Sequence, residues 1–192
     1  MSKRIAFLSA VAFGALTLTG TFVAPASAKD KMTKSEMSGE KTVMVGGAPM
    51  YPSKNIVENA MNSKDHTTLV AAVKAAGLVK TLEGKGPFTV FAPTNAAFGK
   101  LPAGTVDNLV KPENKATLTK ILTYHVVPGK LEASDLTDGK KLKTVEGEEL
   151  TVKNSGGTVM LVDAKGGTST VTIPNVNQSN GVIHVVDTVL MP

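Results

Sequence analysis

Apolar residues gather in a short run at residues 88–92, which predicts a strand in the interior of a domain. A Gly-Pro pair precedes the run and a proline follows it, as is typical of strand boundaries. Because successive side chains of a strand point to opposite faces, Phe91 lies on one face. The other face carries Phe88, Val90 and Ala92. A strand that is apolar on both faces is expected inside a domain, not at its edge.

The residues directly after this strand predict the start of a short helix. The side chain of Thr94 or Asn95 can accept a hydrogen bond from a free N–H group of the first helical turn. Phe98 and Leu101 would then turn this helix back onto the sheet.

Apolar residues at helical spacing predict two helices before the strand. The first, capped by Ser53, has the apolar positions Ile56, Val57, Ala60 and Met61. The second, capped by Asp65 or Thr67 and ended by Gly77, has the apolar positions Leu69, Val70, Val73 and Ala76. His66 stands at the start of the second helix without an acidic or histidine partner at ligand spacing, so we expect it on the surface.

After the strand, residues 104–110 and 112–124 are predicted to form two more helices. One face of the second helix must be buried, because it carries Leu118, Ile121, Leu122 and His125. Tyr124 lies about 100 degrees around the helix from His125, so we expect its hydroxyl group at the rim, in water.

From residue 130 onward the pattern is that of strands. Short runs rich in β-branched residues, separated by glycine-containing turns, predict an antiparallel meander at residues 142–145, 150–152, 159–162 and 171–173. The last stretch, residues 181–192, alternates so that each face is mostly apolar and carries one ionisable group, His184 or Asp187. We expect this strand to be buried on both sides.

Three blocks of the sequence resemble signature blocks of fasciclin-like (FAS1) domains. They read TVFAPTNAAF at residues 89–98, LTYHVVPG at residues 122–129 and GVIHVVDTVLMP at residues 181–192. The signature positions are Phe91, Thr94, Asn95, Phe98, His184 and Asp187. The resemblance covers residues 53–192 and implies an α+β fold, a wedge-shaped antiparallel β-sandwich of two sheets with several α-helices packed over it.

The resemblance also implies an exported or cell-surface protein that takes part in adhesion, here a single-domain bacterial one. In animal matrix relatives, integrin binding involves the tyrosine–histidine block, which Tyr124 and His125 match, and an Asp-Ile pair, which aligns with Asn175 and Val176. The carboxylate of that pair is missing here, which argues against integrin-type, metal-assisted recognition. His125 and His184 lie on apolar faces, where a histidine is more often a hydrogen-bonded core residue than a ligand. We expect Asp187 to accept hydrogen bonds from backbone N–H groups or a hydroxyl group.

Residues 1–28 are typical of a secretory signal peptide, with a basic start, an apolar centre and a small-residue cleavage site. A membrane anchor is the alternative, but the apolar segment is short for a membrane span. Residues 29–52 are rich in polar residues and glycine and predict a flexible linker that becomes ordered near its end. Four methionines in this linker could bind Cu(I), but without histidine or cysteine nearby a plain linker is the preferred interpretation.

The composition argues against several classes of function. The chain has no cysteine, and its net charge of +5 comes without a basic cluster that contains aromatic residues, so nucleic-acid binding has little support. No catalytic, metal-binding or cofactor-binding motif is present. We expect a secreted protein, periplasmic or extracellular, that is monomeric, is not stably inserted in the membrane after signal cleavage and binds a protein or polysaccharide partner. A carrier of a small apolar ligand, a pigment or a lipid, is the second hypothesis, and an enzyme the third.

Overall fold

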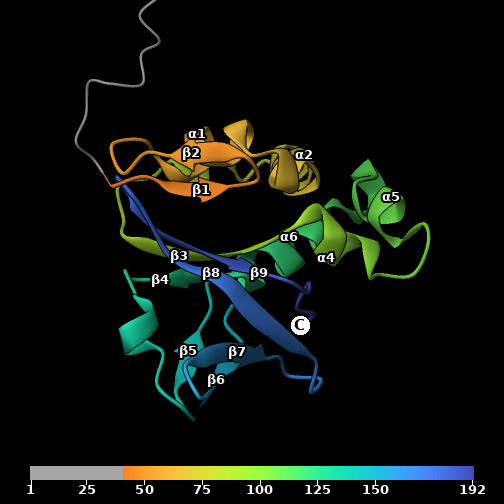
Figure 1. Ribbon diagram of the computed structural model, residues 1–192. Helices are drawn as coiled ribbons and strands as arrows, with labels where there is room; N and C mark the ends of the chain where they lie inside the picture. Colours follow the sequence, from red (N-terminus) through yellow and green to blue (C-terminus); the bar gives the residue numbers. More distant parts are fainter. Residues whose placement is uncertain (1–40) are drawn as a thin grey trace, which may run out of the picture. The chain divides into compact units, whose positions relative to one another are not determined.

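Strand β3 (Phe88–Pro93) lies inside a seven-stranded sheet in the computed structural model, which describes residues 41–192 (Figure 1). Its neighbours are β4 (Val126–Pro128), which is antiparallel to it, and β9 (Gly181–Val186), which is parallel to it. The strand order is β4-β3-β9-β8-β7-β6-β5. The interior position predicted for this strand is therefore confirmed, whereas the β3–β9 pair departs from a purely antiparallel arrangement.

The predicted meander forms from β5 (Lys141–Lys143), β6 (Glu149–Ser155) and β7 (Thr158–Val162), all antiparallel. The long strand β8 (Thr168–Gln178) joins the two halves of the sheet. Its beginning pairs with β7, and its later part pairs with β9 through two register shifts. These irregularities bend β8, so that β5, β6 and β7 lie below β3 and β9 in Figure 1 as the second layer of a sandwich.

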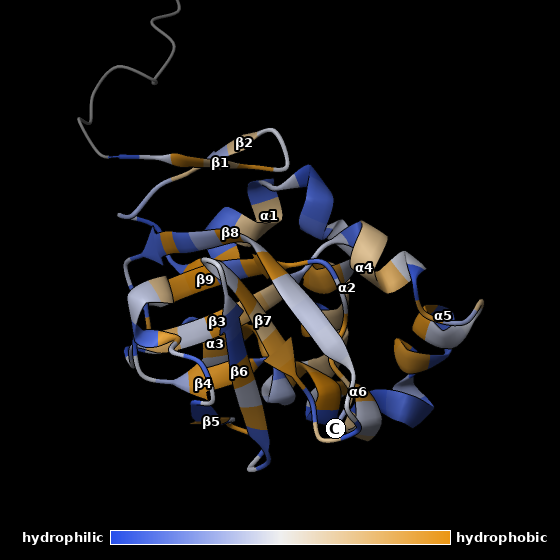
Figure 2. Ribbon diagram, turned by 60° about the horizontal axis from the view of Figure 1, so that its bottom comes forward, coloured by the Kyte–Doolittle hydropathy of each residue, from blue (hydrophilic) through white to orange (hydrophobic). Residues whose placement is uncertain are grey.

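The two faces of β3 enter two separate apolar cores. Val90 and Ala92 belong to the core between the sheet and the helices. Phe91 is fully buried in the second core, between the two layers of the sandwich. The other large members of this second core are Tyr124, Leu136, Leu142, Leu150, Leu161 and Leu190. In Figure 2 the hydrophobic colouring covers most of β9, which is buried along its whole length.

Within residues 41–192, six short α-helices flank β3 in sequence, and α1 and α2 lie on the side of the sheet opposite to β5–β7 (Figure 1). The α-helices are α1 (Ile56–Asn62), α2 (Thr67–Ala76), α3 (Val79–Leu82), α4 (Asn95–Gly99), α5 (Thr105–Leu109) and α6 (Lys115–Tyr124). Single 3₁₀ turns are η1 (Lys64–His66), η2 (Pro112–Asn114) and η3 (Ala133–Asp135). In residues 41–192, no helix is long and apolar enough to span a membrane.

Local capping explains where the helices begin and end. Asn55, not the predicted Ser53, caps α1, because Asn55 and Glu58 form a reciprocal capping box. Gly77 ends α2 in a left-handed conformation with φ of 75°, as predicted. The Thr94 hydroxyl group accepts a hydrogen bond from the Ala97 N–H at 3.2 Å and caps α4.

The linker predicted at residues 29–52 is ordered near its end, as expected, but this ordered part belongs to the domain. Residues 43–50 form a hairpin of β1 (Val43–Val45) and β2 (Ala48–Met50), turned by two glycines that both have positive φ. Val45 and Met50 are buried in the core between helices and sheet, so the domain begins before residue 53. The first part of the predicted linker and the signal peptide at residues 1–28 lie outside the described residues.

The final strand is shorter than its alternating pattern suggests. β9 ends at Val186, and the following residues leave the sheet, although Leu190 is still buried. At the other end, β9 begins at Gly181, which pairs with Phe88. A Cβ atom at Gly181 would lie 1.9 Å from the Phe88 carbonyl oxygen, so only glycine allows this close approach.

Candidate functional site

Tyr124 lies in the core, not at the rim where its helical position predicted it. Its side chain is 0% exposed between the two layers of the sandwich. The hydroxyl group accepts a hydrogen bond from the Ala164 N–H at 3.0 Å and donates one to the Glu149 carbonyl at 3.4 Å. Burial raises the pKa of Tyr124. The last turn of α6 lies between the two cores. The angle of about 100 degrees between Tyr124 and His125 therefore points the Tyr124 side chain into the second core.

His125 is the buried core histidine that its apolar helix face predicted. Its Nδ1 lies 2.8 Å from the Ile121 carbonyl oxygen, and its Nε2 accepts a hydrogen bond from the Leu190 N–H at 3.0 Å. A carbonyl group can only accept and an amide N–H can only donate, so the ring is neutral and carries its proton on Nδ1. Burial lowers the pKa of His125 to about 4, against the smaller opposing effects of the Ile121 carbonyl and Asp163.

His184, also predicted as a core histidine, is fully buried and uses the opposite tautomer. Its Nε2 donates to the Leu131 carbonyl at 2.9 Å, and its Nδ1 accepts from the Asn175 N–H at 3.4 Å. The ring stacks on Phe91 with 5.6 Å between ring centroids. Burial lowers the pKa of His184, so this group too is neutral.

Of the pair Asn175 and Val176, the first is half-buried and the second is buried. Asn175 has φ of 57° at the irregular part of β8, and its Oδ1 accepts a hydrogen bond from the Ala133 N–H at 2.7 Å. Val176 is buried in the core between helices and sheet. Both residues therefore shape β8, and the expectation that they form a binding site together with Tyr124 and His125 is not supported by their positions.

Asp187 follows β9 and is more exposed than expected, with 39% of its side chain accessible. Partial burial alone would raise its pKa. Hydrogen bonds from the Thr170 N–H at 2.9 Å, the Thr188 hydroxyl group at 3.0 Å and Lys100 at 3.3 Å outweigh this effect and lower the pKa of Asp187. The expected donors, a backbone N–H and a hydroxyl group, are both present.

The remaining signature residues are also structural. Asn95 ties α4 to the start of α2, because its Oδ1 accepts from the Thr68 N–H at 3.0 Å and its Nδ2 donates to the Lys64 carbonyl at 2.8 Å. Phe98 is buried against the sheet.

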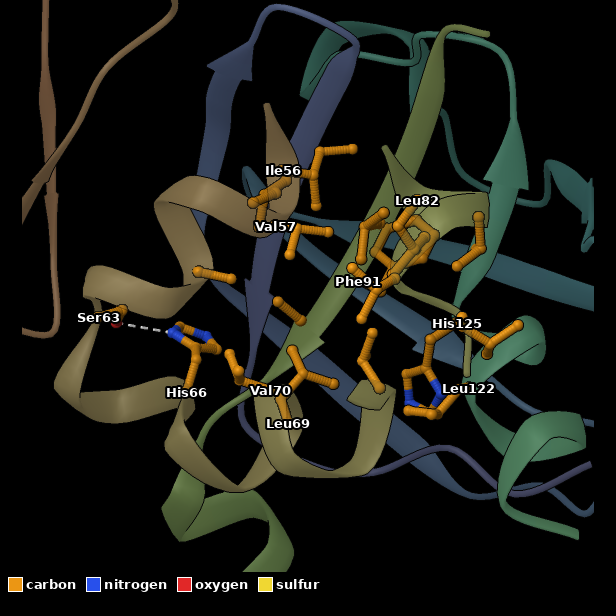
Figure 3. Close-up of a pocket in the computed structure, with 18 of the residues that line it drawn as sticks. Ile56, Val57, Ser63, His66, Leu69, Val70, Leu82, Phe91, Leu122 and His125 are labelled. Carbon is orange, nitrogen blue, oxygen red and sulfur yellow. Dashed lines mark hydrogen bonds between the residues drawn. The ribbon is translucent and has the colours of Figure 1, made fainter. Parts of the chain in front are cut away.

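An apolar cavity lies between the sheet and helices α1–α3 (Figure 3). Its volume is about 50 Å³. Its walls include Met50 from the hairpin, Val57 from α1, Val73 from α2 and Phe91 from β3. His66 and His125 both line it and are separated across the view in Figure 3.

His66 is 3% exposed, so its expected surface position is wrong. Its Nδ1 lies 2.9 Å from the Ser63 Oγ, while its Nε2 is buried without a hydrogen-bond partner. Burial lowers the pKa of His66, and the nearby Ala92 backbone and Asp65 carboxylate oppose this less strongly. A signal was present in the sequence, because His66 continues the stripe of Leu69, Val70 and Val73 at offsets of three, four and seven residues.

The described part of the chain offers no metal site, since no group of three His, Asp or Glu side chains in residues 41–192 could hold an ion. The candidate site is thus an apolar cavity lined by His66, whose Nε2 is unpaired. The polar signature residues make hydrogen bonds within the fold.

The sequence model of the Fasciclin domain family matches residues 64–192, about two thirds of the chain. The chain belongs to the fasciclin domain family. It is 51% identical over 153 residues to Protein sll1483 of Synechocystis, covering 80% of this chain and 82% of that protein. It is also 41% identical over 138 residues to the cell surface glycolipoprotein MPB83 of Mycobacterium bovis, covering 69% of this chain and 58% of that protein.

A solved structure has the same fold. It is a FAS1 domain pair from the insect cell adhesion molecule fasciclin I, with a TM-score of 0.66 and 18% sequence identity. The similarity covers 74% of this chain and 52% of that chain. At this identity the likeness establishes the fold alone, and it confirms the α+β FAS1 fold expected for this fasciclin-domain protein.

Proposed function

We propose that this fasciclin-domain protein is an exported, non-catalytic module that binds a protein or polysaccharide at the cell surface or in the envelope. The observation that carries the proposal is family membership over residues 64–192, together with a relative described as a cell surface glycolipoprotein. The signal-peptide pattern of residues 1–28 supports export. Residues 29–192 keep a net charge of +3 once Lys3 and Arg4 are removed, which favours contact with acidic surface polymers.

A binding role without catalysis agrees with the state of the polar residues. The three histidines are buried, and their pKa values are lowered, so none is an exposed acid, base or nucleophile. Tyr124 and His125 are fully occupied by internal hydrogen bonds. We therefore place the binding surface outside the tyrosine–histidine block.

The experiment is a binding titration of labelled protein, residues 29–192, on intact cells and on purified cell-wall polymer of the producing bacterium. The expected result is saturable binding that unlabelled protein competes away. An unrelated exported protein of equal net charge is the control, because simple charge attraction would bind both alike. Binding that never saturates, or that the control reproduces, would remove the support for this function.

A second candidate function is carriage of a small apolar ligand, and one observation favours it. The apolar cavity between the sheet and α1–α3 contains a buried nitrogen without a hydrogen-bond partner. The cavity lies between the helices and the sheet. Protein purified from its own host can be extracted with organic solvent, and mass spectrometry of the extract tests for a bound molecule. Fully folded protein that releases no molecule would argue against carriage.

A further inference from the structure

The charges of the domain are divided unequally between its two sides. Residues 41–125, which form the hairpin, β3 and the α-helices, contain ten lysines and five acidic residues, a net charge of +5. Residues 126–192, which form the remaining strands, contain six lysines and eight acidic residues, a net charge of −2. Since α1 and α2 lie opposite to β5–β7 (Figure 1), the excess of positive charge lies on the helical side of the domain.

Most lysines of the helical side are not paired with an acidic residue. Of the ten, Lys100 and Lys120 form ion pairs, both with acidic residues from the other part of the chain. The Lys54 ammonium group lies over the Tyr51 ring, 5.2 Å from its centroid. The other seven form no ion pair within residues 41–192, so their charges are available to an external anion.

Three of these seven lysines lie around the carboxyl end of α2 and are called the lysine cluster. Lys74 is in the last turn of α2, and Lys80 is in α3, three residues after Gly77. Lys115, the first residue of α6, reaches the same place, because a Cβ atom at Gly77 would lie 3.6 Å from its Nζ. All three lysines are exposed, and residues 66–82 contain no acidic residue. The carboxyl end of a helix carries about half a negative charge, so three ammonium groups more than balance it.

We infer that the lysine cluster binds an acidic polysaccharide of the envelope, whose carboxylate groups contact the three ammonium groups. The inference rests on the proposed function, surface binding, and it names the binding face and the chemistry of the partner. Because the positive and negative charges lie on opposite sides, the field of the domain turns its helical side towards a polyanion.

Other acidic partners fit the lysine cluster less well. A protein partner is usually held by aromatic or large apolar side chains at the centre of the interface. A helix that binds a membrane surface places apolar side chains among the lipids. The exposed large hydrophobic residues of the described part are Met44, Met61 and Val145, and none of them lies in α2, α3 or α6. A polysaccharide that is held by its charges and hydroxyl groups needs no such apolar anchor.

The test first compares classes of polyanion. Protein comprising residues 29–192 is titrated at neutral pH on immobilised alginate, a polysaccharide of uronic acids, and on neutral dextran, polyglutamate and phosphatidylglycerol vesicles. We expect saturable binding to alginate that weakens as the ionic strength rises, and no binding to dextran. Polyglutamate and the vesicles should bind more weakly than alginate. Tighter binding to either of them would overturn the polysaccharide as the partner.

Two triple variants then locate the binding face. The first removes the lysine cluster by the changes Lys74→Gln, Lys80→Gln and Lys115→Gln. The control makes the same change at three exposed lysines of the second layer that form no ion pair within residues 41–192, namely Lys143→Gln, Lys153→Gln and Lys165→Gln. Both variants lower the net charge of residues 29–192 from +3 to zero. The cluster variant should bind alginate about three- to thirtyfold more weakly, as expected for the loss of several exposed ion pairs, and the control should keep the wild-type affinity.

Circular dichroism verifies that each variant is folded. The Lys74 side chain also lines the apolar cavity, so the change at this residue is the one that could disturb the core. If the cluster variant does not fold, the double variant Lys80→Gln and Lys115→Gln replaces it, and the matched control is then Lys143→Gln and Lys153→Gln.

The outcomes separate the inference from the function on which it rests. Equal losses of affinity in the cluster variant and the control would show that only the net charge matters, and would overturn the assignment to the helical side. Undiminished binding of the folded cluster variant to intact cells would overturn the inference but leave surface binding as the function. Absence of saturable binding by wild type to cells and to every polymer would overturn both.

Discussion

The buried His125 makes the stability of the domain depend on pH in a way that can be calculated. In the folded state its pKa is lowered to about 4 from the ordinary value of 6.5. Between these values the unfolded chain binds a proton that the folded chain does not, so acidification favours unfolding. This contribution is fully present above pH 6.5 and is lost as the pH falls towards 4.

The magnitude follows from the linkage relation. At about pH 4.5, His125 alone should reduce the free energy of unfolding by about 2.5 kcal/mol relative to neutral pH. His66 and His184 add to the loss, because burial lowers the pKa of each. For a domain with a typical stability of about 5–15 kcal/mol, this is a large fraction.

Urea melts at several pH values between 7 and 4 measure this free energy, and His125→Gln is the matched variant. Glutamine can replace one donor and one acceptor but does not titrate, so the variant should be less stable at neutral pH and lose stability less steeply on acidification. An equal slope in wild type and variant would contradict a neutral, buried His125. A histidine titration by NMR with a pKa near 6.5 for this residue would contradict it directly.

Three further predictions test the fold and the export. Phe91→Ala should lower the free energy of unfolding by about 3–5 kcal/mol in urea melts, since it empties a fully buried site between two layers, and a loss below about 1 kcal/mol would be inconsistent with that position. A protein that begins at Tyr51 should be less stable by more than about 2 kcal/mol than one that begins at Lys41, because it lacks the buried Val45 and Met50; equal melting curves would show that the hairpin is not part of the core. Mass spectrometry of the exported protein should find Lys29 as its first residue, whereas full-length protein in the membrane fraction would indicate an anchor.

The organising strand and both of its faces could be predicted from the sequence, because local apolar pattern and interior position coincide there. Phe91 and Val90 enter different cores, as the alternation required. The meander was predictable for the same reason, since glycine-containing turns separate short runs of β-branched residues. The family resemblance added the layered arrangement of sheet and helices, but it did not predict the parallel pairing of β3 with β9.

The candidate site was much less predictable, and Tyr124 shows why. Helical geometry gives the angle between neighbouring residues but not the number of cores around a helix. In this domain the Tyr124 side chain packs into a second core. With a single core, the same helical position would face water. The hairpin at residues 43–50 was missed because its strands are only three residues long, and its valines pack on helices that follow later in the chain.

The predicted surface position of His66 is wrong for a related reason. A histidine at the start of a helix is usually solvated, and the hydrophobic part of the stripe that His66 continues begins only at Leu69. Its burial depends on the hairpin and on Ser63, which anchors the ring against Val45. The helical spacing therefore indicates a buried face, whereas the partners that cover His66 come from tertiary packing.

The core position of the tyrosine–histidine block is tested by the affinity of Tyr124→Phe for intact cells and cell-wall polymer, measured beside wild type at equal concentrations of folded protein. Removing the buried hydroxyl group should cost about 1–3 kcal/mol of stability, because the Ala164 N–H loses its acceptor. We predict saturable binding with the same dissociation constant for both proteins, as expected for a binding module whose tyrosine–histidine block belongs to the core. Loss of binding by the folded variant would show that the block takes part in binding, and no saturable binding by wild type would contradict the proposed function.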